Sequence, residues 1–103
     1  MSTHIFEHQF LPGEPYFKGH FPGNPVVPGV VIIDTVLGYL TGEDAGAQVE
    51  AIPKIKFTEP VLPGQLLRIE IIRSYPKVSF KVYRDNSLVA EGELRIREEN
   101  PDE

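Results

Sequence analysis

The chain has 103 residues, the size of one domain or of one subunit in a larger assembly. Its 15 acidic and 10 basic residues give a formal net charge of −5, which argues against a nucleic-acid partner. It has no Cys, so disulfides, thiol catalysis, iron–sulfur clusters and Cys-based zinc sites are excluded. The longest apolar run is Val30 to Ile33, too short to span a membrane, and the N-terminus lacks a signal-peptide pattern. We therefore expect a cytoplasmic protein without a membrane partner.

The N-terminal third combines a short strand with a long irregular segment. A strand is predicted over residues 4–10, because alternation places Phe6, His8 and Phe10 on one face. Residues 12–29 then contain five Pro and four Gly, a composition that excludes a helix or a central strand. Long irregular loops in compact domains are usually functional, so this segment is the first candidate for a site.

A helix is predicted over residues 29–40, GVVIIDTVLGYL. Pro28 stands where a helix would start and Gly42 where it would stop. The segment is apolar on nearly every side, so we expect the rest of the structure to enclose it. Its β-branched run is also compatible with a strand, but the Pro-Gly start and the length favour a helix.

The remainder of the chain predicts four strands. Apolar and polar residues alternate with a period of two, which is typical of an antiparallel sheet covered on one side. Asp85-Asn86 is predicted as the hairpin turn between the last two strands. The expected strands are residues 49–59, 65–75, 77–84 and 88–97.

Together these elements predict an α+β domain in which an antiparallel sheet of about five strands wraps one central helix. A single domain is expected over residues 1–103, with residues 98–103 as a frayed acidic tail. The open edges of such a sheet favour pairing between subunits.

Three residues in and after the Pro-rich segment suggest chemistry. His20 lies in a loop that prolines stiffen, which fixes a side chain at low entropic cost. Gly29 starts the helix, where backbone N–H groups can stabilise negative charge on an oxygen. Asp34 has Val30, Val31, Leu37 and Gly38 as helical neighbours. Carboxyl groups in apolar surroundings have raised pKa values and can act as acids.

A base, an oxyanion donor and an acid suit proton abstraction beside a carbonyl with loss of a β-hydroxyl. The residues alone leave the alternative open. A single His in a loop is more often structural or solvated. A buried Asp34 could equally tie down Asn24 or a backbone amide through a hydrogen bond.

The stretch GHFPGNPVVPGVVIID, residues 19–34, resembles the active-site segment of the β-hydroxyacyl-(acyl carrier protein) dehydratases, a hotdog-fold thioester dehydratase family. A second stretch, KIKFTEPVLPGQLLRIEI at residues 54–71, resembles the strand, Pro-Gly turn and strand that follow the central helix in that family. Together they cover about half of the chain. The resemblance implies the hotdog fold, in which an antiparallel sheet wraps a long helix.

The resemblance also implies a hydro-lyase that converts a 3-hydroxyacyl thioester into a trans-2-enoyl thioester in fatty-acid, polyene or polyketide-type synthesis. His20 would take the α-proton, Gly29 would supply the oxyanion N–H, and Asp34 of the other subunit would protonate the leaving hydroxyl. The substrate would ride on acyl carrier protein or coenzyme A. Neither a metal nor another cofactor is implied. The expected assembly is a homodimer or a higher oligomer built from dimers.

Substrate-binding residues follow from the same resemblance. Phe21, Pro22, Gly23 and Val30 are expected to contact the substrate. Tyr16 and Phe17 either cap the acyl pocket or anchor the Pro-rich loop in the core.

The sequence departs from the family pattern at two places. The acidic position holds Asp34, whereas the most similar-looking members have Glu; Asp is normal in a sister branch that also isomerises double bonds. The stretch from Asp34 to Lys54 is shorter than in the main fatty-acid dehydratases, so the helix is expected to end at about Leu40 and the acyl pocket to differ.

Other functions remain open at this stage. A hotdog thioesterase would use Asp34 to activate water, but does not need the GHFPG loop. A non-catalytic acyl-thioester-binding subunit, or the partner of a second dehydratase, is also compatible with the sequence. His4 and His8 have the spacing of a helical metal pair, yet lie on a predicted strand without a third ligand.

Overall fold

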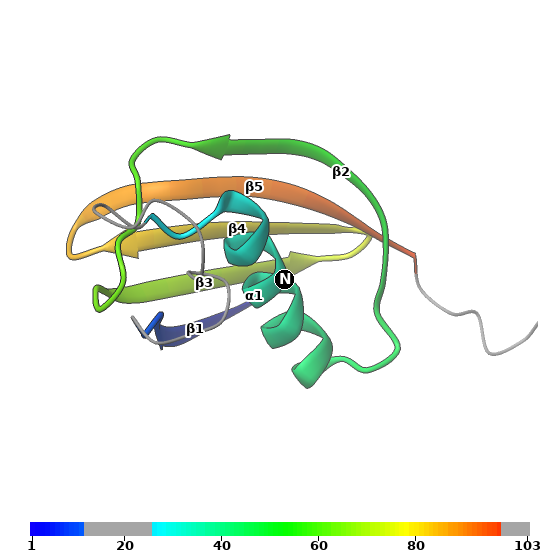
Figure 1. The fold of residues 1–103 in the computed structure, drawn as a ribbon. Helices are drawn as coiled ribbons and strands as arrows, with labels where there is room; N and C mark the ends of the chain where they lie inside the picture. The colour runs from blue at the N-terminus through cyan, green and yellow to red at the C-terminus, as the bar shows by residue number, and fades with distance from the viewer. Residues whose placement is uncertain (12–25, 98–103) are drawn as a thin grey trace, which may run out of the picture.

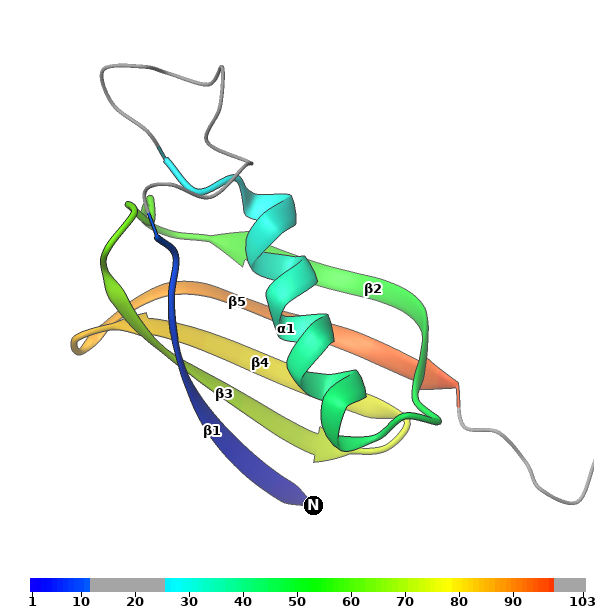
Figure 2. The ribbon, with the colours of Figure 1, turned by 60° about the horizontal axis from the view of Figure 1, so that its bottom comes forward.

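The computed structural model describes residues 1–11 and 26–97, which fold into one antiparallel sheet covered on one face by one helix. The elements are β1 (Ser2–Gln9), α1 (Gly29–Glu43), β2 (Gln48–Phe57), β3 (Leu66–Ser74), β4 (Lys77–Arg84) and β5 (Ser87–Arg97). The strand order is β1-β3-β4-β5-β2, so the first two strands of the chain form the two edges. Figures 1 and 2 show α1 lying across the face toward which the sheet curls. This is the predicted hotdog arrangement.

Alternation within the central strands places one apolar side chain in every two beneath the helix. The inward residues are almost fully buried: Leu67, Ile69 and Ile71 on β3, Val78, Phe80 and Val82 on β4, and Leu94 and Ile96 on β5. They face Ile32, Val36 and Leu40, which stack along one side of α1 at four-residue spacing and complete the core.

The predicted boundaries differ from the structure mainly at the helix end. The four later strands lie within two residues of prediction, and the hairpin turn falls at Asp85-Asn86, where Asp85 has the positive φ of 55° that such turns favour. However, α1 continues through Gly42 to Glu43 instead of ending at about Leu40. The Asp44 N–H caps it by donating to the Leu40 carbonyl at 3.0 Å.

One side of α1 is not enclosed by its own chain. Val30 is 71% exposed, and Asp34 and Gly38 follow it on the same exposed face at four-residue spacing. The sequence predicted enclosure on every side, and that prediction is wrong for the described part of one chain. The reason is geometric, because a single curled sheet can cover only one side of a helix.

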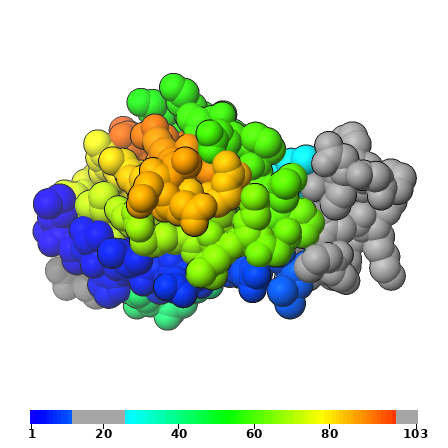
Figure 3. Space-filling model, turned by 90° about the vertical axis from the view of Figure 1, so that its left-hand side faces the viewer, coloured from blue at the N-terminus to red at the C-terminus, as the bar shows by residue number. Residues whose placement is uncertain are grey.

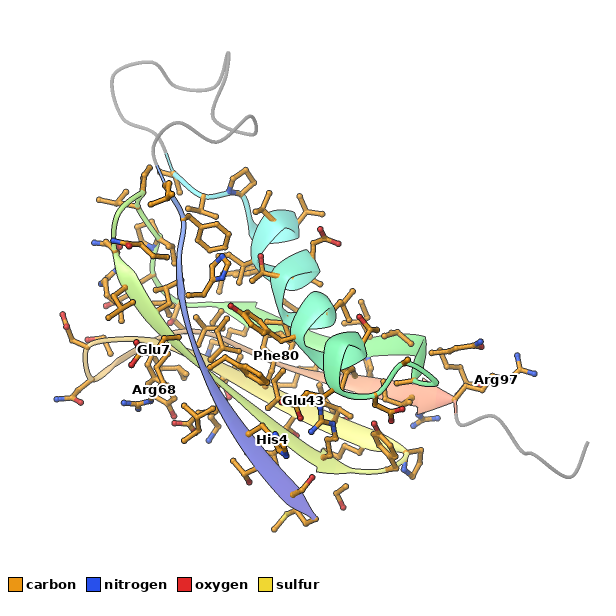
Figure 4. All side chains as sticks on the ribbon, turned by 90° about the horizontal axis from the view of Figure 1, so that it is seen from below. His4, Glu7, Glu43, Arg68, Phe80 and Arg97 are labelled. Atoms are coloured by element: carbon orange, nitrogen blue, oxygen red, sulfur yellow. The ribbon has the colours of Figure 1, made fainter. Side chains whose placement is uncertain are left out.

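Aromatic and charged contacts fix α1 to the edge strand β1. Phe6 stacks on Tyr39 with ring centroids 4.5 Å apart, and His8 Nδ1 shares a 2.9 Å hydrogen bond with the Tyr39 hydroxyl. At the other end of the helix, His4 Nδ1 lies 2.6 Å from a Glu43 carboxylate oxygen (Figure 4). Both histidines therefore serve helix–strand contacts. None of the helices in the described ranges has the length and apolar character to cross a bilayer.

Candidate active site

The candidate site lies where α1 begins, beside the loop that joins β2 to β3. Pro28 precedes the helix with extended backbone (φ −60°, ψ 143°), and its carbonyl accepts the first helical hydrogen bonds from the N–H groups of Val31 and Ile32. Earlier N–H groups in a helix have no acceptor within it. Gly29 is the first residue of α1, so its N–H is one of these groups.

A cavity of about 380 Å³ adjoins this helix start. Its walls come from the residues before α1, from the first turn of α1 and from the β2–β3 loop. Among the described lining residues, hydrophobic side chains predominate and Glu59 alone is charged. The lining residues are Val26, Val27, Gly29, Ile32, Phe57, Thr58, Glu59, Pro60 and Val61. Such a cavity fits a neutral, mainly apolar group better than an anion.

The β2–β3 loop is held firmly as one wall of this cavity. The Thr58 N–H donates to the Val89 carbonyl at 2.9 Å. Arg84 reaches across from β4, donating to a Glu59 carboxylate oxygen at 2.7 Å and to the Pro60 carbonyl at 2.8 Å. Figure 3 shows this end of the molecule, with the loop in green beside the residues before α1 in cyan.

The same loop holds both flanks of the Pro-rich segment. On one side the Gly64 N–H donates to the Phe10 carbonyl at 2.7 Å, and on the other the Val27 N–H donates to the Val61 carbonyl at 2.8 Å. Phe10, Val27 and Val61 are each at most 3% exposed. The described residues on either side of the Pro-rich segment, Phe10 and Val27, are therefore both held by this one loop beside the cavity.

The structure brings only part of the predicted site together. Gly29 lines the cavity, whereas Val30 and Asp34 lie on the exposed face of α1. The apolar enclosure predicted for Asp34 is absent in the described part of one chain, because its neighbours Val30 and Gly38 share that exposed face. The other predicted residues fall outside the described residues: Tyr16, Phe17, His20, Phe21, Pro22 and Gly23.

Sequence reasoning missed the wall that β2 and its loop supply. Phe57, Thr58 and Val61 lie in the second family-like stretch, which was interpreted as structural. The signal that could have indicated this wall is the Pro63-Gly64 turn, which follows the strand in that stretch. Among the described residues, no three His, Asp or Glu side chains gather as metal ligands.

Comparison with known proteins agrees with this architecture. Residues 1–93 match the model of a family described as ApeI-like, ApeI dehydratase. The 3-hydroxyacyl-[acyl-carrier-protein] dehydratase FabZ of Geotalea uraniireducens is 38% identical over 97 residues, which cover 80% of this chain and 67% of that protein. FabZ of Syntrophotalea carbinolica is 36% identical, with 80% and 65% covered. The chain thus spans about two thirds of the length of these relatives.

Solved structures give the same fold. A chain of the dehydratase heterocomplex ApeI:P from Xenorhabdus doucetiae superposes with a TM-score of 0.84 at 28% identity, over 91% of this chain and 86% of that one. An acyl-CoA hydrolase of Staphylococcus aureus in complex with butyryl coenzyme A is also similar, with a TM-score of 0.71, 14% identity, and 97% and 65% covered, which shows the fold alone. With a family match over residues 1–93, this chain belongs to the ApeI-like dehydratase family.

Proposed function

We propose that this protein is a hydro-lyase that dehydrates a 3-hydroxyacyl thioester, carried on acyl carrier protein or coenzyme A, to a trans-2-enoyl thioester. The bonds broken are Cα–H and Cβ–O, a Cα=Cβ double bond forms, and water leaves. The observation that carries the proposal is the apolar cavity at Gly29, the first residue of α1, in a chain of this dehydratase family.

The residues present suit the steps of this reaction. His20, in the segment joined to the fold beside the cavity, takes the α-proton as general base. The negative charge that develops on the thioester oxygen is stabilised by the Gly29 N–H and by the positive end of the α1 dipole. Asp34 protonates the leaving hydroxyl, directly or through water. Fatty-acid, polyene and polyketide-type synthesis all require this step.

We further propose that the working unit is a dimer of this chain, or a larger oligomer built from such dimers. The exposed side of α1 carries Val30, and the neighbouring edge strand β2 exposes Ile52, which is 42% exposed. β2 has a sheet partner on one side only, so a second β2 can extend the sheet. A second copy of the chain at this surface would enclose Asp34. It would also bring Asp34 of the first copy toward His20 of the second.

One assay separates the candidate functions. The purified protein is incubated with 3-hydroxyacyl-pantetheine and with enoyl-pantetheine thioesters, while conjugated-product absorbance and free thiol are followed together. Dehydration or hydration without thiol release supports the hydro-lyase. Thiol release would identify a thioesterase. The absence of both signals would indicate a binding subunit or the partner of a second dehydratase.

Loss of either the base or the acid should abolish dehydration. His20→Ala and Asp34→Asn are each expected to lower kcat by about 10²- to 10⁴-fold, the usual contribution of a general acid or base. The double variant should be little worse than either single variant, because both groups act on one transition state. Melting temperatures within a few degrees of wild type serve as the control for folding. Full activity in His20→Ala would contradict the assignment.

A further inference from the structure

The last residue of β2, Phe57, lies directly against the first residue of α1. A Cβ atom placed on Gly29 would stand 2.8 Å from Phe57 Cζ and 2.9 Å from Cε2, closer than real Cβ contacts allow. The ring therefore occupies the space that any other residue at position 29 would need. An alanine at position 29 would force the Phe57 ring to move, whereas glycine lets the ring approach the helix backbone closely.

The backbone that carries this ring is rigidly placed. Phe57 pairs with Ala90 in the β2–β5 ladder, and the following residue, Thr58, bonds the Val89 carbonyl through its N–H. Ala90 and Val89 are both fully buried. A side chain attached to such a ladder can hold a neighbouring group within a small distance of one position.

The ring is nonetheless not a core residue. Phe57 is 45% exposed and lines the cavity together with Gly29. A phenylalanine that served only packing would be expected inside the core, as Phe80 is at 1% exposure. The ring thus contacts the helix start and also lines the cavity, where part of the exposed side chain is available to a ligand.

We propose that Phe57 is a positioning residue for the thioester carbonyl. This inference rests on the proposed function. The ring fixes the first turn of α1, forms the apolar wall beside the Gly29 N–H, and excludes water from that N–H when an acyl thioester fills the cavity. A shift of about 1 Å in such a wall can cost about 10²-fold in rate, which sets the scale of the expected effect.

The test compares Phe57→Leu, Phe57→Tyr, Gly29→Ala and the double variant Gly29→Ala/Phe57→Leu. Leucine removes the outer ring atoms that meet position 29, whereas tyrosine keeps the ring. We expect Phe57→Leu to lower kcat by about 10- to 100-fold and Phe57→Tyr to stay within a few-fold of wild type. Gly29→Ala should lower both the melting temperature and kcat. In the double variant the melting temperature should recover and kcat should not.

Recovery of kcat together with melting temperature in the double variant would overturn the proposal, since the ring would then matter only as an obstacle. Unchanged kcat in Phe57→Leu would overturn it as well. Ile5→Ala, which trims a 60% exposed side chain on β1, is the matched control and should leave kcat unchanged.

A binding measurement separates this inference from the proposed function. The Gly29 amide is followed by NMR during titration with a saturated acyl-pantetheine thioester. If the wild type binds it without dehydrating hydroxyacyl thioesters, the proposed function fails, and weaker binding by Phe57→Leu still supports the positioning role. Equal binding by wild type and Phe57→Leu, or no response of the Gly29 amide, would overturn that role.

Discussion

Gly92 of β5 is glycine because a phenylalanine ring crosses the strand at that point. A Cβ atom there would lie 2.6 Å from Phe80 Cε1 and 2.8 Å from the carbonyl oxygen of Lys54 on β2. Phe80 is among the largest fully buried side chains and lies beneath α1 (Figure 4). Neither the ring nor the β2 backbone can withdraw without disturbing the core or the ladder.

Gly92→Ala should therefore lower the free energy of unfolding by about 1–3 kcal/mol, the usual cost of overpacking a core. Gly46→Ala is the matched control, because a Cβ atom there would find its nearest atom, an Asp44 carboxylate oxygen, at an ordinary 3.7 Å. That variant should stay within about 0.5 kcal/mol of wild type. Chemical denaturation measures both, and equal effects of the two substitutions would contradict the packing described here.

At the scale of elements, the β2–β3 loop depends on one side chain from β4. Besides Glu59 and Pro60, Arg84 contacts Gln65 Oε1 at 3.3 Å, and that same amide oxygen accepts the Leu62 N–H at 3.0 Å. The side chains of Arg84 and Glu59 are 25% and 44% exposed, so solvent weakens their ion pair. The hydrogen bonds to the loop supply the rest of the stabilisation.

Arg84→Ala should lower the free energy of unfolding by about 1 kcal/mol and speed amide hydrogen exchange across residues 58–65. Arg68→Ala is the control, since Arg68 stacks on Tyr83 and pairs with Glu70 outside this loop. If exchange across the loop were equally fast in both variants, Arg84 would not be the side chain that holds the cavity wall.

Periodicity accounts for how well the elements could be predicted. The inward Val78, Phe80 and Val82 are apolar and buried, and their alternation with less buried side chains predicts β4 where it is observed. The end of α1 could not be predicted in this way. Gly42 has open space around it and costs a helix only about 1 kcal/mol, so the backbone bond from Asp44 decides where the helix ends.

The candidate site was predictable only in part. Residues 19–34 pointed to Gly29, because the N–H groups at a helix start depend on the local sequence and not on a residue far away in the chain. Phe57 stands 28 residues away in the chain, and only the pairing of β2 with β5 brings it to the helix. Apolar neighbours along a helix do not tell which side a sheet will cover, and Asp34 lies on the side of α1 that one chain leaves exposed.

For the whole molecule, the exposed side of α1 is the surface on which the proposed dimer depends. Gly38 lies on this face after Val30 and Asp34, and a Cβ atom on it would meet nothing within 4 Å in the described part of one chain. In an isolated chain, Gly38→Ala should therefore stabilise the helix by up to about 1 kcal/mol. In the proposed dimer, the added methyl group would press on a close-packed neighbour.

Sedimentation velocity over a range of concentrations should show a dimer for the wild type and a dissociation constant raised at least 10-fold by Gly38→Ala. Gly46→Ala, at a glycine outside α1 where a Cβ atom would find its nearest atom at an ordinary 3.7 Å, is the control and should leave the dissociation constant unchanged. A wild type that stays monomeric at micromolar concentration would favour a different hotdog subunit as its partner. If the two substitutions changed the dissociation constant equally, this face of α1 would not be part of the interface.

The two hydrogen bonds that join Phe10 to Gly64 and Val27 to Val61 have an evolutionary consequence. Phe10 and Val27, the described residues on either side of the connection, are held by residues 61–64 of one loop, so the two points that the connection joins lie near each other. Each doubling of a flexible loop costs only about 0.6 kcal/mol in closure entropy. A descendant of this chain can therefore change the length of that connection at a small cost in stability, while the sheet and the helix stay as they are.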